Sequence, residues 1–138
     1  MTMAPDFTLP YIDKDKQLTL SDLRGKMVLL TFWASWCPDC SQDMPMKERL
    51  YQTVDQEKLA MVTINVTGRE RQHEDAVRYK ANFISQPTLI DRGRETYLNY
   101  NALGVPTTVL IDQDGNIVKQ WGENLNFLSL MEAISPYL

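Results

Sequence analysis

The sequence predicts an α/β protein whose central sheet is mixed and flanked by helices. An almost wholly apolar run, residues 27–34, is typical of a buried central strand. Strand-like and helix-like segments then alternate, an order typical of strands joined by helical crossovers. Near the end, Asp114-Gly115 lies between two strand-like runs, which is a strong hairpin signal and adds antiparallel pairing.

Each further element follows from its local pattern. Residues 4–26 form an N-terminal extension with strand-like pieces and a helical turn over 22–24, with Ser21 as the expected cap and Gly25 as the stop. Pro38 suits the first turn of a helix that should run to about residue 54, with Pro45 as an internal kink. The other expected elements are a strand over 58–66, a helix over 68–83, a strand over 87–91, a short helix over 93–103, two hairpin strands within 106–122 and a final helix over 125–138.

Composition limits both organisation and function. The 138 residues contain no internal repeat or linker, so we expect a single domain over 1–138 and a monomer. A net charge of −4 gives no electrostatic basis for binding nucleic acid. No apolar run approaches the ~18 residues of a membrane span. The first ten residues contain no recognisable secretory leader, so the protein is expected to be cytoplasmic or to have a leader outside this sequence.

Both cysteines, Cys37 and Cys40, lie in the segment FWASWCPDCS, residues 32–41. A disulfide between them would close a very small loop and would constrain the unfolded chain little, so stability is a poor reason for it. The pair lies where the buried strand gives way to a helix, and the N–H groups of a helix N-terminus stabilise a thiolate. This arrangement favours a dithiol couple, with Cys37 as an exposed nucleophile and Cys40, more buried, resolving the mixed disulfide.

Other interpretations of the pair are weaker. A zinc site needs four ligands, and the chain offers no third cysteine and one histidine, His73, within a charged run, so no metal is expected. Haem attachment needs a histidine directly after the second cysteine, where Ser41 stands. Nothing places His73 as the base of a cysteine hydrolase.

Inert burial of both thiols remains an alternative. In residues 43–46, DMPM, core methionines beside the helix kink are favoured over a copper-binding pair.

The segment FWASWCPDC resembles the active-site segment of the thioredoxin superfamily, including a tryptophan, Trp36, before the first cysteine. Pro45 matches the kink proline of that family's active-site helix. Residues 104–122, GVPTTVLIDQDGNIVKQWG, are similar to its cis-proline loop and the hairpin that follows. The stretch from residue 4 to the cysteines is similar to the TlpA/ResA-like branch and to the related peroxiredoxins. The resemblance implies a thioredoxin-like fold with an N-terminal extension and a βα insertion.

The resemblance also implies a function and a substrate groove. It implies exchange of dithiol and disulfide with protein substrates, with no cofactor beyond the redox-active disulfide and with an upstream dithiol as electron donor. The cis-proline is assigned to Pro106 rather than Pro87, because the hairpin follows Pro106. Trp36, Val105 and Pro106 are expected to shape the groove, with the backbone of Val105 pairing with the substrate. An extracytoplasmic location is implied, with a cytoplasmic one as the alternative.

The sequence departs from the family pattern at several points. Thr31 stands where thioredoxin has a buried aspartate six residues before the first cysteine, so the proton of Cys40 must come from elsewhere or from water. Glu70 is the nearest candidate for the active-site glutamate of the ResA-like branch, although its register is shifted; the alternative is a solvated carboxylate at the next helix's first turn. Pro38 and Asp39 separate the cysteines. A carboxylate beside a thiolate disfavours the charged form, so Asp39 should make the couple more reducing.

The resulting hypothesis is a reductant of protein disulfides, with a role of the cytochrome c maturation type suggested by the resemblance. Peroxidase activity is not expected, because Leu30 and Ala34 stand where peroxiredoxins have a proline and a threonine or serine. Two alternatives stay open. An oxidant or isomerase would differ only in its reduction potential, and a non-catalytic, chaperone-like module would use the groove to hold peptides.

Overall fold

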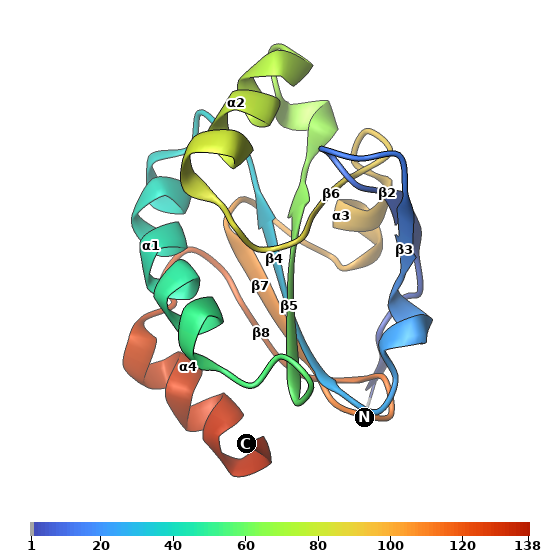
Figure 1. The fold of residues 1–138 in the computed structure, drawn as a ribbon, viewed down its shortest axis with the longest axis vertical. Helices are drawn as coiled ribbons and strands as arrows, with labels where there is room; N and C mark the ends of the chain where they lie inside the picture. Colours follow the sequence, from blue (N-terminus) through green and yellow to red (C-terminus); the bar gives the residue numbers. More distant parts are fainter. Residues whose placement is uncertain (1) are drawn as a thin grey trace.

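The computed structural model describes residues 2–138, and a central mixed sheet organises it (Figure 1). The strands are β1 (Thr2–Met3), β2 (Thr8–Pro10), β3 (Gln17–Thr19), β4 (Met27–Trp33), β5 (Leu59–Asn65), β6 (Thr88–Ile90), β7 (Thr107–Ile111) and β8 (Asn116–Trp121). The α-helices are α1 (Pro38–Thr53), α2 (His73–Phe83), α3 (Glu95–Asn99) and α4 (Phe127–Ile134). Short 3₁₀ turns lie at Leu20–Leu23 (η1), Thr67–Arg69 (η2) and Ser135–Tyr137 (η3).

Six strands form the main sheet in the order β1-β8-β7-β4-β5-β6, and β2 and β3 form a separate ribbon. The pairs β4–β5 and β5–β6 are parallel, whereas β4–β7, β7–β8 and β1–β8 are antiparallel. The mixed α/β architecture predicted from the sequence is therefore confirmed. The extra strand that the expected βα insertion begins at Pro87 corresponds to β6, which pairs in parallel with β5.

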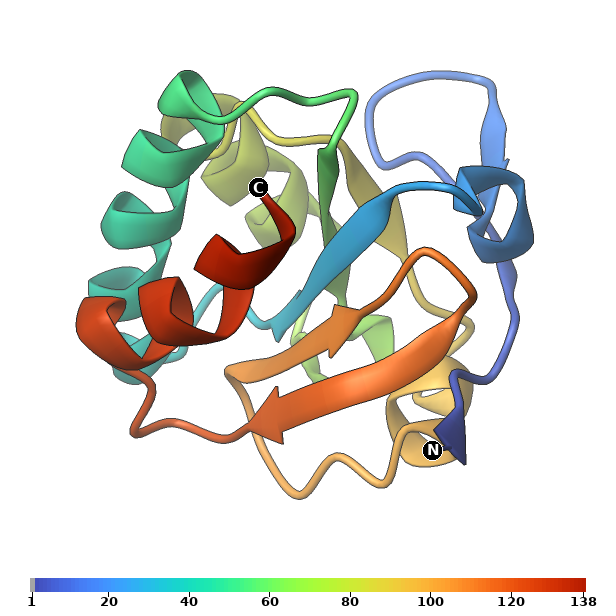
Figure 2. The same ribbon diagram turned by 90° about the horizontal axis from the view of Figure 1, so that it is seen from below.

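The helices cover the two faces of the sheet unequally (Figures 1 and 2). Helices α1, α2 and α4 lie on one side of it, and α3 lies on the other side with the β2–β3 ribbon. Both helical crossovers between parallel strands, α1 and α2, therefore lie on the same face. This follows from the right-handed rule for such connections, because both crossovers step in the same direction along the sheet.

Strand β4 is buried along its whole length because it has neighbours on both edges and helices or ribbon on both faces. Alternate side chains enter different clusters. Met27 and Leu29 pack with Leu50 of α1 and with residues of α4. Val28, Leu30 and Phe32 belong to the larger cluster, which also contains the residues Phe7, Leu9, Leu20, Tyr97 and Tyr100. A continuous apolar run is the sequence signature of such a strand.

Two predicted boundaries at the start of helical segments are wrong. Ser21 does not cap the first helical turn, because η1 begins at Leu20 and no side chain caps it. The backbone N–H of Ser21 instead donates to the Asp6 carboxylate at 2.9 Å. The helix expected over 68–83 begins only at His73. Before it, the N–H of Gly68 donates to the carbonyl of Gly93 at 2.9 Å, which holds the segment against the next loop.

The two later helices are also shorter than predicted. Helix α3 ends at Asn99, and Asn101 adopts a left-handed conformation with φ 55° that does not continue a helix. Helix α4 ends at Ile134, and residues 135–137 form a separate 3₁₀ turn. Within residues 2–138, no helix combines the length and apolar character that crossing a membrane requires.

The carboxylate of Glu48 on α1 forms hydrogen bonds with the loop before β6. Glu48 accepts hydrogen bonds from the N–H and hydroxyl of Ser85, at 2.8 and 2.6 Å, and from the N–H and amide of Gln86, at 3.3 and 2.9 Å. Partial burial raises the pKa of Glu48, but these donors outweigh it and hold the pKa below its usual value. The ionised carboxylate is therefore the form that stabilises the fold.

Replacing Glu48 with Gln tests this attachment. Because the pKa of Glu48 is lowered on folding, its contribution is fully present above the unfolded value of about 4.3 and is lost as the pH falls through the folded value. Glu48→Gln should lower the free energy of unfolding at pH 7 and should cost progressively less between about pH 5 and pH 3. Urea denaturation of both proteins across this range measures the difference. A cost that does not change with pH would contradict the assignment.

Candidate active site

The two cysteines lie at the end of β4, where the chain turns into α1. Cys37 is the residue that caps α1, with extended backbone angles (φ −82°, ψ 116°), and Pro38 is the first helical residue. The backbone N–H of Cys40 donates to the Sγ atom of Cys37 at 3.2 Å. Pro38 suits this position because its missing N–H would have had no helical partner. The sulfur of Cys37 therefore lies at the N-terminus of a sixteen-residue helix.

Both thiols are free and both are buried, with residue exposures of 3% for Cys37 and 1% for Cys40. The expectation of an exposed Cys37 is wrong. The Cys37 thiol lies against the loop before β7 and donates to the carbonyl oxygen of Val105 at 3.4 Å. A segment far away in the sequence thus covers the thiol, and only a small part of Cys37 faces solvent.

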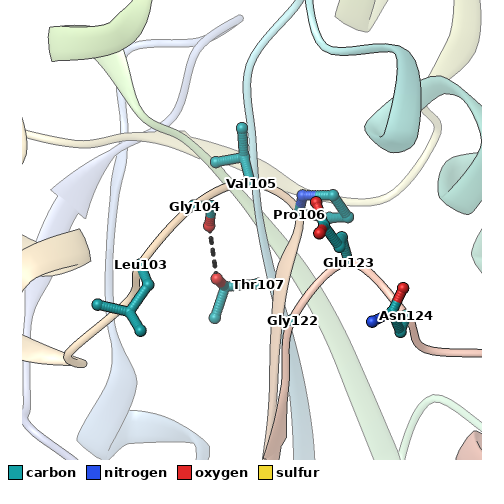
Figure 3. A pocket seen from close by; sticks show the side chains of 8 residues that line it. All are labelled: Leu103, Gly104, Val105, Pro106, Thr107, Gly122, Glu123 and Asn124. Atoms are coloured by element: carbon teal, nitrogen blue, oxygen red, sulfur yellow. Dashed lines mark hydrogen bonds between the residues drawn. The ribbon is translucent and has the colours of Figure 1, made fainter.

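The loop that covers Cys37 contains the proline assigned from the sequence. The Val105–Pro106 peptide bond is cis, which confirms the choice of Pro106 over Pro87. The hydroxyl of Thr107 donates to the carbonyl of Gly104 at 2.6 Å and closes the turn. Figure 3 shows the pocket beside it, lined by Leu103, Gly104, Val105, Pro106, Thr107, Gly122, Glu123 and Asn124. The side chain of Leu103 is fully exposed at the rim of this pocket.

Trp36, the residue before Cys37, is half exposed and lines a hollow with Arg69, separate from the pocket at Val105 and Pro106. Its indole N–H donates to the carbonyl of Arg69 at 2.6 Å. The guanidinium of Arg69 lies 5.3 Å from the centroid of the Trp36 ring and donates to the hydroxyl of Tyr97 at 3.2 Å. These contacts fix a large aromatic surface next to Cys37.

Glu70 lies behind the loop that precedes Cys37. Its carboxylate accepts from the N–H and hydroxyl of Ser35, at 2.7 and 2.5 Å, and from the side-chain amide of Asn65 at 2.7 Å. The turn η2 shifts Glu70 away from the end of β5 and directs it back under this loop. Glu70 is therefore neither at the first turn of α2 nor hydrogen-bonded to a cysteine in the part of the chain described.

The environment of Cys40 disfavours its thiolate. Burial raises the pKa of Cys40 strongly, and the hydrogen bond to Cys37 raises it further. A backbone interaction with Ala34 lowers it, while the negative charges of the Cys37 thiolate and Asp43 act to raise it. A buried thiol of this kind needs a nearby proton acceptor if it is to attack a disulfide.

Two functional candidates, Asp43 and Lys47, were missed by sequence reasoning. Lys47 is completely buried, with its Nζ atom 2.7 Å from the Oδ2 atom of Asp43 and 2.6 Å from the hydroxyl of Thr108, to which it donates. Asp43 is itself nearly buried, with 7% of its side chain exposed. Cys40, Asp43 and Lys47 are spaced by three and four residues, which places them on one side of α1. This spacing was the signal available in the sequence.

The buried pair lies beside the position where thioredoxin has its aspartate. Thr31 is buried there and pairs with Thr108 across β4 and β7. Residues directly opposite on paired strands have their side chains on the same face of the sheet. Thr31 is therefore a neighbour of Thr108, the residue whose hydroxyl accepts the hydrogen bond from Lys47. The ionisable groups near Cys40 thus come from the helix and not from the sheet.

In this site a central strand is followed by a helix that begins with a Cys-X-X-Cys motif, and a cis-proline loop lies against the first cysteine. These features together define a dithiol protein with the thioredoxin fold. Residues 1–120 match the model of the AhpC/TSA family, and the chain belongs to this family.

The chain is similar to curated relatives of known name. It is 38% identical over 115 residues to the thioredoxin-like protein YneN of Bacillus subtilis, covering 83% of this chain and 66% of the relative. It is 36% identical over 115 residues to the thiol-disulfide oxidoreductase ResA of Geobacillus kaustophilus, covering 83% of this chain and 64% of the relative. The chain therefore spans slightly less than two thirds of the length of these relatives.

The fold is shared with solved structures. The crystal structure of a putative thiol:disulfide interchange protein DsbE from Chlorobium tepidum superposes with a TM-score of 0.85 at 27% identity. The match covers 99% of this chain and 95% of that chain. The thioredoxin-like fold implied by the sequence resemblance is thereby confirmed.

Replacing Glu70 with Gln separates a scaffold role from a role in acid–base chemistry. An amide cannot accept all three hydrogen bonds, so Glu70→Gln should destabilise the protein by about 1–3 kcal/mol. It should also slow disulfide exchange by loosening the loop at Ser35, with the shape of the pH–rate profile unchanged. Urea denaturation and the pH dependence of the exchange rate measure the two effects. A profile that loses one ionisation would instead identify Glu70 as an active-site acid.

Proposed function

We propose that this protein is a thiol-disulfide oxidoreductase that reduces protein disulfides with the Cys37–Cys40 pair. The observation that supports this best is the position of the Cys37 sulfur. It lies at the N-terminus of α1, 3.2 Å from the N–H of Cys40 and 3.4 Å from the carbonyl of Val105 in the cis-proline loop. The chain needs no metal or prosthetic group for this chemistry, since the electrons are held by the two sulfurs.

In the first step the Cys37 thiolate attacks one sulfur of a substrate disulfide. A Cys37–substrate S–S bond forms, the substrate S–S bond breaks, and the other substrate sulfur leaves as a thiolate. The N–H of Cys40 is already directed at the Cys37 sulfur, so the attacking anion is stabilised without rearrangement.

In the second step Cys40 attacks the sulfur of Cys37 and releases the second substrate thiolate. The protein is oxidised to the Cys37–Cys40 disulfide, and the substrate has gained two electrons. Cys40 must first lose its proton, and Asp43, one turn later on α1, is the carboxylate whose charge acts on the Cys40 thiol. An upstream dithiol donor then restores the reduced pair.

Two features favour a reductant over an oxidant. Strong oxidants of this class owe their potential to a stabilised reduced form. Here the Val105 carbonyl accepts a hydrogen bond from the Cys37 thiol but cannot accept one from the thiolate. Asp39, an exposed acid in the first turn of α1, adds a negative charge at the same helix start. Both features leave the thiolate less stabilised and the couple more reducing.

The pocket at the cis-proline loop, lined in part by Val105 and Pro106, suits an extended protein segment whose backbone pairs with that of Val105. Trp36, which lines a separate hollow with Arg69, adds an exposed apolar surface next to Cys37. Residues 1–138 act as one domain and as a monomer in this proposal. Its location is extracytoplasmic, and its role is of the cytochrome c maturation type or a related thiol reduction, in keeping with the TlpA/ResA-like resemblance.

Cysteine variants test the order of the two steps. Cys37→Ser should abolish reduction of a protein disulfide such as that of insulin, because no nucleophile remains. Cys40→Ser should still attack but should accumulate a mixed disulfide through Cys37, which mass spectrometry detects. If Cys37→Ser keeps its turnover, the assignment is wrong. If the wild-type protein has no turnover but binds unfolded chains, it is a peptide-binding module.

The reduction potential tests the direction of electron flow. Equilibration with dithiothreitol followed by thiol trapping should give a value near or below about −270 mV, the value of thioredoxin. Asp39→Asn should raise it by about 10–20 mV, because removing an acid next to a helix N-terminus changes the thiolate energy by about 0.5–1 kcal/mol. A wild-type value near −120 mV, roughly that of DsbA, would make the protein an oxidant.

A further inference from the structure

A fully buried lysine beside the resolving cysteine has no part in the mechanism so far. Lysine is almost never fully buried without a charged partner. Lys47 has 0% exposure, and its ammonium contacts the Asp43 carboxylate at 2.7 Å and the Thr108 hydroxyl at 2.6 Å. Burial lowers the pKa of Lys47, while Asp43 and Cys40 act to raise it. The lysine is thus placed where it senses the charge of both groups.

The ionisable groups around this ammonium are few in the part of the chain described. Cys40 and Asp43 face it from α1 itself, and Cys37 lies one turn before Cys40. On the sheet side, β7 offers the uncharged Thr108. From α2, the Tyr79 hydroxyl lies 3.1 Å from that of Ser41; burial raises the pKa of Tyr79, and the charges of Cys40, Cys37 and Asp43 add to this. Helix α4 contributes the apolar side chains Leu130 and Ile134 to the cluster that also contains Leu50 of α1.

One buried cation can balance one anion at a time. In the resting dithiol, Lys47 balances the Asp43 carboxylate. If a proton passes from the Cys40 thiol to that carboxylate, the thiolate replaces it as the single negative charge. The net charge of the buried group is the same before and after the transfer. Without the ammonium, either state would leave an unpaired buried anion, which is strongly disfavoured.

We propose that Lys47 is a positioning residue that serves as the fixed counter-charge for proton transfer from Cys40 to Asp43. This inference rests on the proposed function, because it concerns the step in which Cys40 attacks the mixed disulfide. The balance is simple: the S–H bond of Cys40 breaks, an O–H bond forms on Asp43, and no electron moves until the thiolate attacks Cys37. Lys47 itself keeps its proton throughout.

The proposal predicts opposite effects for the two members of the pair. Lys47→Met removes the counter-charge with a side chain of similar size, so the Cys40 thiolate should appear at higher pH. Asp43→Asn removes the competing anion and leaves the ammonium free to pair with the thiolate, which should then appear at lower pH. A role limited to packing would move the titration in the same direction in both variants or leave it unmoved.

The titration is measured in a Cys37→Ser background, where Cys40 is the single thiol. The rate at which iodoacetamide alkylates Cys40 is followed against pH for the parent protein and the two variants, because below the pKa this rate is proportional to the thiolate fraction. We expect shifts of about one pH unit or more, upward for Lys47→Met and downward for Asp43→Asn. Lys58→Met, which removes an exposed lysine just before β5, is the matched control and should give no shift.

Kinetics with Ellman's reagent test the same proposal with both cysteines present. The first thionitrobenzoate is released when Cys37 attacks, and the second is released when Cys40 resolves the mixed disulfide. Lys47→Met should slow the second release by ~10-fold or more and leave the first unchanged. Lys58→Met should change neither phase.

The outcomes separate this inference from the proposed function. A wild-type protein without a first phase would overturn the proposed function itself. A normal first phase with a second phase that Lys47→Met leaves unchanged would overturn only the role of Lys47, as would shifts of the same sign in the two titrations. If Lys47→Met does not fold, the double variant Lys47→Met/Asp43→Asn replaces the pair by uncharged groups, a change that proteins often tolerate. This double variant should fold, and its Cys40 should resolve the mixed disulfide slowly. If its second thionitrobenzoate release is as fast as that of the wild-type protein, the proposal is also overturned.

Discussion

The pairing of β4 on both edges is the constraint on which the site depends. β5 pairs with it in parallel and β7 pairs with it antiparallel, with Phe32 opposite Thr107. Because β7 runs in the opposite direction, its beginning lies beside the end of β4. The residue that follows β4 by a short turn, Cys37, therefore meets the residue that precedes β7, Val105. The contact between the nucleophile and the cis-proline loop is a consequence of sheet order.

Two groups of polar side chains lie on different sides of the contact between Cys37 and the cis-proline loop. Glu70 and Asn65 hold the loop at Ser35, ahead of the cysteines, with hydrogen bonds from the end of β5 and the turn after it. Asp43 and Lys47 lie behind Cys40, within the helix that the cysteines begin. The first arrangement fixes the position of the sulfurs, and the second governs the charge near the buried one. In both arrangements a partly buried carboxylate contacts a donor, the Asn65 amide in the first and the Lys47 ammonium in the second.

Local patterns made much of the fold and part of the site predictable. The apolar run of β4, the proline after Cys37 and the Asp114-Gly115 turn each act within a few residues, and each lies where the sequence placed it. The burial of Cys37 was not predictable in this way, because the covering carbonyl of Val105 comes from 68 residues later. Lys47 and Asp43 were missed since charged residues on a helix are normally solvated, and only tertiary packing turns that side of α1 inward.

The same sheet order has a consequence for the newly made chain. The cysteines are followed by about a hundred residues, and the residue that covers Cys37, Val105, comes 68 residues after it. Until β7 has been synthesised and has joined β4, nothing from the cis-proline loop shields the Cys37 sulfur. During biogenesis the Cys37 thiol is thus more exposed than in the finished protein, where both thiols are buried. The chain acquires its reactive sulfurs before it acquires the segment that buries them.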